Sequence, residues 1–195
     1  MVQADHKPLY FSYSSVTSAY IFQTLSDVAT LPNTPVAHTT STFTPNCALS
    51  AYGRVWVADI VNDRQTVYFS DLLDPLNFLT GTAGSLNISE VIGDGDFIVA
   101  LAAHNGFLII FCEKNIVIYK GAENPLGDFM FHDTIAGVGC SARDSLQSTG
   151  NDLIFLSDTG IRSLGRLLQE KSLPMRDLTK NVRDDLLKDV LQERV

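Results

Sequence analysis

The sequence predicts a mainly β protein, built as part of a β-propeller from repeated antiparallel blades, with one amphipathic helix at the C-terminal end. Short runs rich in aromatic and β-branched residues favour strands. A unit of several strands recurs along the middle of the chain, and helical periodicity replaces it after Pro174. The alternative for the same strands is a β-sandwich, but the repeat is longer than the roughly 8–12-residue strand spacing of a sandwich.

Residues 1–46 form the first of three predicted regions. Apolar residues alternate with polar ones between Leu9 and Thr24 in two short runs, which predicts a β-hairpin. The stretch from Ala29 to Asn46 is rich in Thr, Pro and Ser and has no helical period. We therefore expect a long extended connection there.

Residues 47–173 carry the repeat. Each unit has a short strand, a tight turn, an apolar strand, a second turn and a further strand. The tight-turn residues lie 53 and 46 positions apart along the chain: Gly53, Gly106 and Asp152. The dipeptide Asn105-Gly106 is a strong hairpin signal, because both central positions of that turn need a positive φ.

A period of about 40–50 residues with several strands per unit predicts propeller blades. The apolar runs 55–58, 107–111 and 153–156 are then inner strands covered on both faces. Three repeats do not close a ring of typically 4–8 blades. Either the chain is part of a longer protein, or partner subunits complete the arrangement.

Residues 174–195 change to a helical pattern. Asp177 is a suitable N-cap, and four apolar residues follow at intervals of four: Leu178, Val182, Leu186 and Val190. This predicts an amphipathic helix of about four turns. It docks either on the sheets of its own chain or on a partner.

The net charge of −8 bears on binding partners. Proteins that grip nucleic acid by its phosphates normally carry a basic patch, and none is visible here. An acidic surface repels DNA, which is appropriate where DNA must move past a protein without binding to it. The same charge is also explained by ordinary solubility. The longest tight apolar run, Phe107 to Cys112, is far shorter than the about 20 residues of a membrane helix, so we expect no membrane-spanning segment. The polar start, residues 1–8, lacks the apolar core of a secretory signal.

Two short motifs resemble a dinucleotide-binding loop and a calcium-binding loop, but each lacks a feature that its function requires. The GxGxxA match at residues 137–142 needs a following helix to bind a dinucleotide, but residues 143–149 read as a strand. Residues 93–96 resemble the start of a calcium loop, yet Ile98, Val99 and Asn105 occupy positions where that loop needs other residues. We therefore predict no catalytic residue, no cofactor and no metal site.

The three cysteines are far apart and never form a CxxC pair: Cys47, Cys112 and Cys140. This argues against a disulfide framework and against a zinc site, and it suits folding in a reducing cytoplasm. Cys112 lies inside an apolar run and is expected to be an inert core residue.

Several segments in sequence order resemble a known family: Val67–Asp71 with Asp74–Phe78, Gly93–Asp96 with Ile98–Leu101, Asn105–Phe111, Ile116–Gly121, Gly137–Cys140 and Gly150–Ile161. Together they are similar to the propeller region of the nozzle (tail tubular protein B) of T7-like short-tailed phages, and to DNA-stabilisation propellers that plug other short tails. The resemblance covers about residues 48–195. Nozzle proteins are several times longer, so the platform and distal-tip regions are missing here or belong to another chain.

The resemblance implies a homo-oligomer, a hexameric tube that lies below the portal and the tail adaptor. Its partners would be the tail adaptor and portal proteins or other nozzle chains. It also implies transient, non-specific contact with genomic DNA, in a virion tail assembled in the host bacterial cytoplasm. The expected function is thus a structural component of a short phage tail, part of the conduit for genome ejection, and not an enzyme.

Four acidic turn residues are candidates for a channel or an interface between subunits: Asp71, Asp74, Asp94 and Asp96. They could equally be solvated turn residues far from any channel. The alternative function is a ligand-binding propeller that recognises carbohydrate or protein. Such a propeller should repeat aromatic residues on its loops, whereas the single tryptophan, Trp56, lies within a predicted strand.

Overall fold

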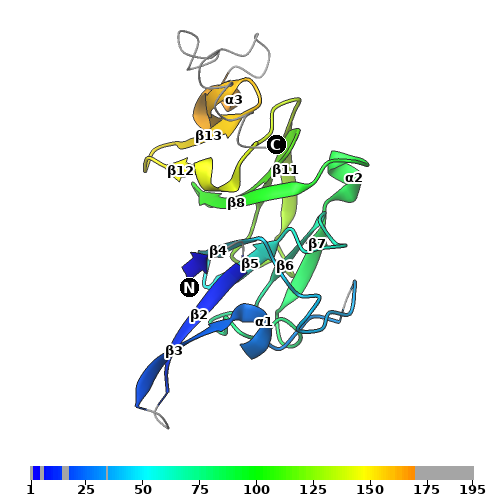
Figure 1. The fold of residues 1–195 in the computed structure, drawn as a ribbon. Coiled ribbons are helices and arrows are strands. Elements are labelled where there is room, and N and C mark those ends of the chain that lie inside the picture. The colour runs from blue at the N-terminus through cyan, green and yellow to red at the C-terminus, as the bar shows by residue number, and fades with distance from the viewer. Residues whose placement is uncertain (1, 5–6, 15–17, 34, 170–195) are drawn as a thin grey trace.

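The computed structural model describes residues 2–4, 7–14, 18–33 and 35–169. Within them the chain is mainly β and forms four antiparallel sheets, joined by short helices (Figure 1). The predicted C-terminal helix, from about Asp177, lies outside these residues. Among the described helices, none has the length and apolar character needed to cross a bilayer.

The N-terminal sheet contains the expected hairpin. Strand β2 (Lys7–Ser14) pairs with β3 (Ala19–Thr24), and β1 (Val2–Ala4) adds to the other side of β2. The hairpin projects away from the rest of the molecule (Figure 1). Three aromatic side chains are exposed on it, and the ring of Tyr20 contacts those of Phe11 and Tyr13. Helix α1 (Leu25–Val28) follows directly.

The three predicted units are present as three consecutive sheets. Sheet I has the strand order β4 (Cys47–Ala51), β5 (Arg54–Ala58), β6 (Thr66–Phe69) and β7 (Gly84–Asn87). Helix α2 (Ser89–Ile92) leads to sheet II, which has the order β8 (Ile98–His104), β9 (Phe107–Cys112), β10 (Asn115–Lys120) and β11 (Met130–Ala136). Sheet III is β12 (Gln147–Ser148), β13 (Leu153–Ser157) and β14 (Gly160–Ser163), followed by helix α3 (Leu164–Gln169).

The expected strand at 143–149 is wrong in part. A short 3₁₀ helix, Arg143–Ser145, replaces its first three residues, and only the two residues of β12 pair. The hydroxyl of Ser145 donates to the carbonyl of Ala142 at 2.6 Å and accepts the amide of Leu156 at 3.1 Å. Such local side-chain bonds compete with strand pairing, which explains the 3₁₀ helix at this position.

The hairpin turns have the predicted conformation. Tyr52 and Gly53 between β4 and β5 have φ values of 56° and 69°, and Asn105 and Gly106 between β8 and β9 have 50° and 79°. Two successive residues with positive φ make the type I′ turn, which matches the twist of antiparallel strands. The two turns are equivalent in sheets I and II.

Hydrophobic cores lie between successive sheets. The core between sheets I and II contains Trp56 and Leu108, and the core between sheets II and III pairs Phe111 with Phe155 at a ring distance of 4.9 Å. Sheet II is thus buried on both faces, which explains the unbroken apolar run of β9. Helix α1 and the connection 29–46 cover the outer face of sheet I around Phe43.

Main-chain hydrogen bonds also link the successive sheets. The amide of Ile98, the first residue of β8, donates to the carbonyl of Arg64 in the β5–β6 loop of sheet I at 3.1 Å. The amide of Cys140, before β12, donates to the carbonyl of Cys112 at the end of β9 in sheet II at 2.8 Å. The segment that enters each sheet is thus attached to the sheet before it.

A buried histidine attaches the connection 29–46 to sheet I. The Nε2 of His38 lies 3.0 Å from the hydroxyl of Tyr68, which donates to a carboxylate oxygen of Asp63 at 2.5 Å. Burial lowers the pKa of His38 below its usual value, against the opposing effect of Asp63. Its Nδ1 is buried and has no partner, so an added proton there would be unsatisfied.

We expect this contact to make the fold sensitive to acid. Because the pKa of His38 is lower in the folded state, its contribution to stability is complete above the unfolded pKa of about 6.5 and is lost as the pH falls towards the folded pKa. In thermal unfolding between pH 7.5 and 5, His38→Gln should lose less stability than the wild type. The exposed His132→Gln is the control, and equal pH profiles for all three proteins would contradict the prediction.

Candidate functional site at the loop end of the sheets

The two ends of the strands carry different loops. At one end, which we call the loop end, the β5–β6 loop (59–65), the β7–β8 connection (88–97) and the segment 141–146 come together. There the side-chain amide of Gln65 donates to the carbonyls of Gly93 at 3.1 Å and Asp96 at 2.9 Å. At the opposite end, the turn end, the β6–β7 loop (70–83) lies beside the turn at Gly53, and the amide of Leu73 bonds its carbonyl at 2.8 Å.

An acidic residue recurs at the loop end. In sheets I, II and III the first residue after the second strand (β5, β9 and β13) is acidic: Asp59, Glu113 and Asp158. Asp59 accepts a bond from the side chain of Asn46, and Asp158 accepts one from Ser141, each donor lying in the segment that leads into its sheet. Asp59 and Asp158 therefore join the second strand of their sheet to the segment that enters it.

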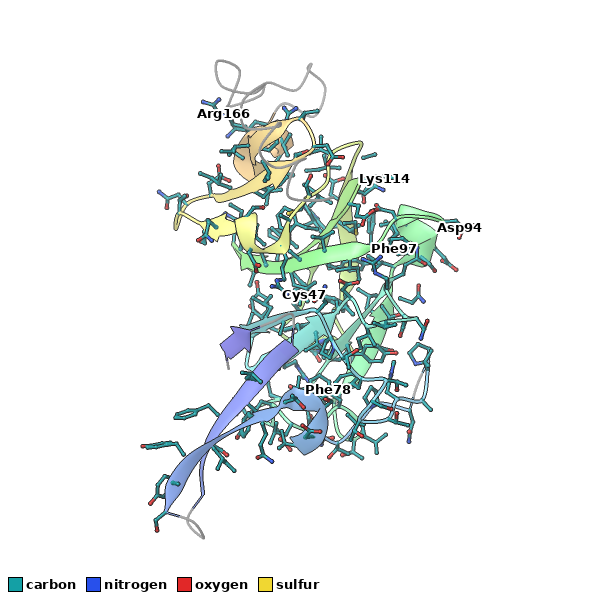
Figure 2. All side chains as sticks on the ribbon, in the orientation of Figure 1. Cys47, Phe78, Asp94, Phe97, Lys114 and Arg166 are labelled. Carbon is teal, nitrogen blue, oxygen red and sulfur yellow. The ribbon has the colours of Figure 1, made fainter. Side chains whose placement is uncertain are left out.

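Two grooves open at the loop end. The larger encloses about 530 Å³ and is lined by residues 61–65, Asn87, Asp94, Gly95 and Phe97. The smaller encloses about 310 Å³ and lies between Asn46, Val99 and the segment 141–144. Figure 2 shows Asp94 and Phe97 on the same side of the molecule as Lys114, whose side chain bonds the carbonyl of Gly95 at 3.4 Å.

Arg64 lines both grooves and is held in place by two neighbours. Its Nε donates to a carboxylate oxygen of Asp59 at 2.6 Å, and its guanidinium carbon lies 4.3 Å from the ring centre of Phe97. Ion pairing and stacking on an aromatic ring fix the plane of the guanidinium group. No described residue forms a hydrogen bond with its two Nη atoms, so they remain available in this arrangement.

Arg143 spans the smaller groove. Its Nη1 donates to the main-chain carbonyl of Asn46, and its Nε and Nη2 donate to the carboxylate of Asp144 at 2.8 and 3.0 Å. The contact joins the segment entering sheet III to the segment entering sheet I. Arg143 and Asp144 also line an adjoining hollow, together with small and apolar side chains of β4 and β8 and Leu146.

The four acidic residues predicted as channel or interface turns do not form one site. Asp71 and Asp74 lie at the turn end, and Asp94 and Asp96 lie at the loop end. Asp94 is exposed and lines the larger groove. Asp71 accepts bonds from Thr82 and from the amide of Leu72, and these bonds, chiefly those from Thr82, lower the pKa of its carboxyl.

Asp96, predicted from the sequence as a channel or interface turn or as a solvated turn residue, is buried. It is only 2% exposed, and its carboxylate accepts the amides of Phe97 at 2.9 Å and Lys114 at 3.0 Å and the side chain of Asn115 at 2.7 Å. Its oxygens fix the β9–β10 turn against the start of β8. A channel surface cannot use a carboxylate that its own chain surrounds in this way.

Asp96 and Asp94 should therefore respond differently to substitution. Asp96→Ala leaves buried donors without a partner and should lower the free energy of unfolding by about 2–3 kcal/mol. Asp94→Ala removes an exposed carboxylate and should change it by less than about 0.5 kcal/mol. Urea unfolding of both variants tests this, and equal effects of the two would contradict the structural role of Asp96.

The three cysteine thiols are buried in the fold. Cys47, Cys112 and Cys140 are buried and unpaired, and burial raises the pKa of each thiol. This agrees with the expectation that Cys112 is an inert core residue. Within the described part of the chain, His, Cys, Asp and Glu side chains form no group of three that could hold a metal ion.

The chain matches no protein-family model and no curated protein sequence. Sequence reasoning did not single out Arg64, Phe97 or Arg143. The sequence does contain two signals that point to this end of the sheets. An acidic residue recurs after the second strand of each unit, and Arg64 follows the first of these acids, Asp59, by five positions.

Proposed function

We propose that the chain is a structural component of a short phage tail, in which it forms an arc of a β-propeller and part of the conduit for genome ejection. Its place would be the virion tail, after assembly in the host bacterial cytoplasm. The resemblance of its repeat to the nozzle family supports this proposal, and so does the way in which its sheets are stacked.

The single observation that carries the proposal is the repeated stacking of sequential sheets. Sheets I and II are each four antiparallel strands in chain order, sheet III starts the same order again, and the first strands β4 and β8 lie beside each other. Propeller blades are stacked in this way around an axis, with typically 4–8 blades in a ring. Three sheets are an arc, so further copies of the chain, as in a hexamer, or the adaptor and portal proteins or other nozzle chains would complete the assembly.

The projecting hairpin supports an assembled state. Phe11, Tyr13 and Tyr20 are 44%, 57% and 65% exposed on it. Aromatic side chains are enriched at protein interfaces, where their large surfaces are removed from water. Among the acidic turns, Asp71, Asp74 and Asp94 remain candidates for an interface or channel surface.

A conduit protein should bind DNA weakly. The net charge of −8 means that repulsion from phosphate dominates at low salt, where screening is least. A gel-shift titration at low ionic strength should show no complex below about micromolar protein, near the lower limit of non-specific binding. Submicromolar or sequence-specific binding would rule out the conduit.

The location can be tested on virions. Antibodies raised against the purified chain should label the tails of short-tailed phage particles that encode this sequence, as seen by negative-stain electron microscopy. Particles that contain no such chain by mass spectrometry, or that are labelled only on the capsid, would refute the proposal.

A further inference from the structure

The larger groove at the loop end has a lining that the proposed structural role does not use. Its volume of about 530 Å³ lies within the range of small-molecule sites, about 300–1,000 Å³. The side chains of Asn62 and Asp94 face no hydrogen-bonding partner among the described residues, and both are exposed at the groove. From these features we infer that the groove binds a neutral saccharide.

The polar groups of the groove come from three segments and are held in place. Arg64 is fixed by Asp59 and Phe97, as described above. The Nε2 of Gln65 donates to two main-chain carbonyls, which leaves its amide oxygen as an acceptor. A preformed set of groups reduces the entropic cost of binding.

The mixture of groups selects the class of ligand. The guanidinium of Arg64 and the amide of Asn62 donate hydrogen bonds, whereas the carboxylate of Asp94 accepts them. Each hydroxyl of a sugar both donates and accepts, so adjacent hydroxyls can satisfy both kinds of group at once.

Ligands of either charge satisfy only part of the lining. Asp63 and Asp94 outnumber the single cation Arg64 in it, so an anion such as phosphate is repelled. A cation such as an ammonium group can pair with Asp94, but it has no acceptor for the donors of Arg64 and Asn62. A neutral polyol satisfies the donors and the acceptor together.

Val61 supplies an apolar surface next to these polar groups. Its side chain is 64% exposed at the groove. The C–H faces of a sugar ring pack against surfaces of this kind, while its hydroxyls reach the polar groups. The site therefore offers both contacts that a saccharide requires.

The test uses the full chain and four neutral probes, the methyl glycosides of glucose, galactose, mannose and N-acetylglucosamine. Ligand-observed NMR should detect at least one of them, and titration calorimetry should give its affinity. Asp94→Ala should weaken that binding about tenfold or more, since a hydrogen bond to a charged group contributes about 1.5–3 kcal/mol. Asp74→Ala, which removes another exposed carboxylate, at the turn end, should leave the affinity unchanged.

Inorganic phosphate and Nα-acetyl-lysine amide, whose side-chain ammonium is free, serve as charged counter-probes. Binding of either charged probe without any glycoside would overturn the proposal, and so would the absence of binding by all four glycosides. Equal affinity of the wild type and Asp94→Ala would also overturn it. Antibody labelling of the virion is unaffected by these outcomes, so the saccharide site and the tail location can fail separately.

Discussion

Replacing Trp56 with alanine is expected to destabilise the fold by about 3–5 kcal/mol, the usual cost of deleting a large buried aromatic side chain. Trp56 is 0% exposed, with ring centres 5.0 Å from Phe69 and 5.7 Å from Phe129. Its Nε1 donates to the carbonyl of Ala51 at 3.1 Å, so the substitution removes both packing and a hydrogen bond. Urea unfolding followed by circular dichroism measures the loss.

Two further variants make this result specific to the core between sheets I and II. Trp56→Phe keeps most of the volume and should cost less than Trp56→Ala. Tyr20→Ala removes an aromatic ring that is 65% exposed on the hairpin and should change stability by less than about 0.5 kcal/mol. If Trp56→Ala unfolds at the same urea concentration as the wild type, the stacking of the two sheets is wrong.

Gly139→Ala should separate sheets II and III. A Cβ at this position would lie 2.1 Å from the carbonyl oxygen of Glu113 and 2.4 Å from that of Cys112, and both are main-chain atoms that cannot rotate away. The neighbouring amide of Cys140 bonds the same carbonyl of Cys112, so relief of the clash breaks the junction. We expect a loss of about 3 kcal/mol, at the upper end of overpacking effects.

Gly137→Ala is the matched control two residues away. No atom lies within 4 Å of its Cβ position, so only its φ of +78° opposes a side chain, at a cost of about 1–2 kcal/mol. Hydrogen exchange separates the variants further. Gly139→Ala should expose the amides of β13, whereas Gly137→Ala should leave them protected, and equal protection in both would contradict the proposed clash.

The sequence predicted the repeated strands well because their signals are local. The turn at Asn105-Gly106 needs positive φ at both central residues, and the buried run of β9 reads as a strand in any context. The fourth strands were missed, since β7 is only Gly84–Asn87 and β11 carries the exposed residues Met130 and Phe131. Pairing with β6 and β10, and not intrinsic propensity, makes these segments strands.

The candidate site was less predictable. Acidic residues in turns read as solvent-exposed, and this holds for Asp94 but not for Asp96, two residues away. The difference arises from the partners of Asp96, the amide of Lys114 and the side chain of Asn115, which follow it by 18 and 19 positions. The groove lining likewise depends on Phe97 and Arg64, which the junction of two sheets brings together. These contacts join residues that are far apart in the sequence, so no short sequence pattern predicts them.

The chain-order pairing of strands has a consequence for how the protein folds. In every sheet each strand pairs with its sequence neighbour, so native contacts form over short loops and can appear one sheet after another as the chain leaves the ribosome. The bond between Arg143 and Asn46 spans 97 positions and cannot form until both intervening sheets are synthesised. It is therefore a late step, and a nascent chain that ends before sheet III should already hold sheets I and II in protease-resistant form.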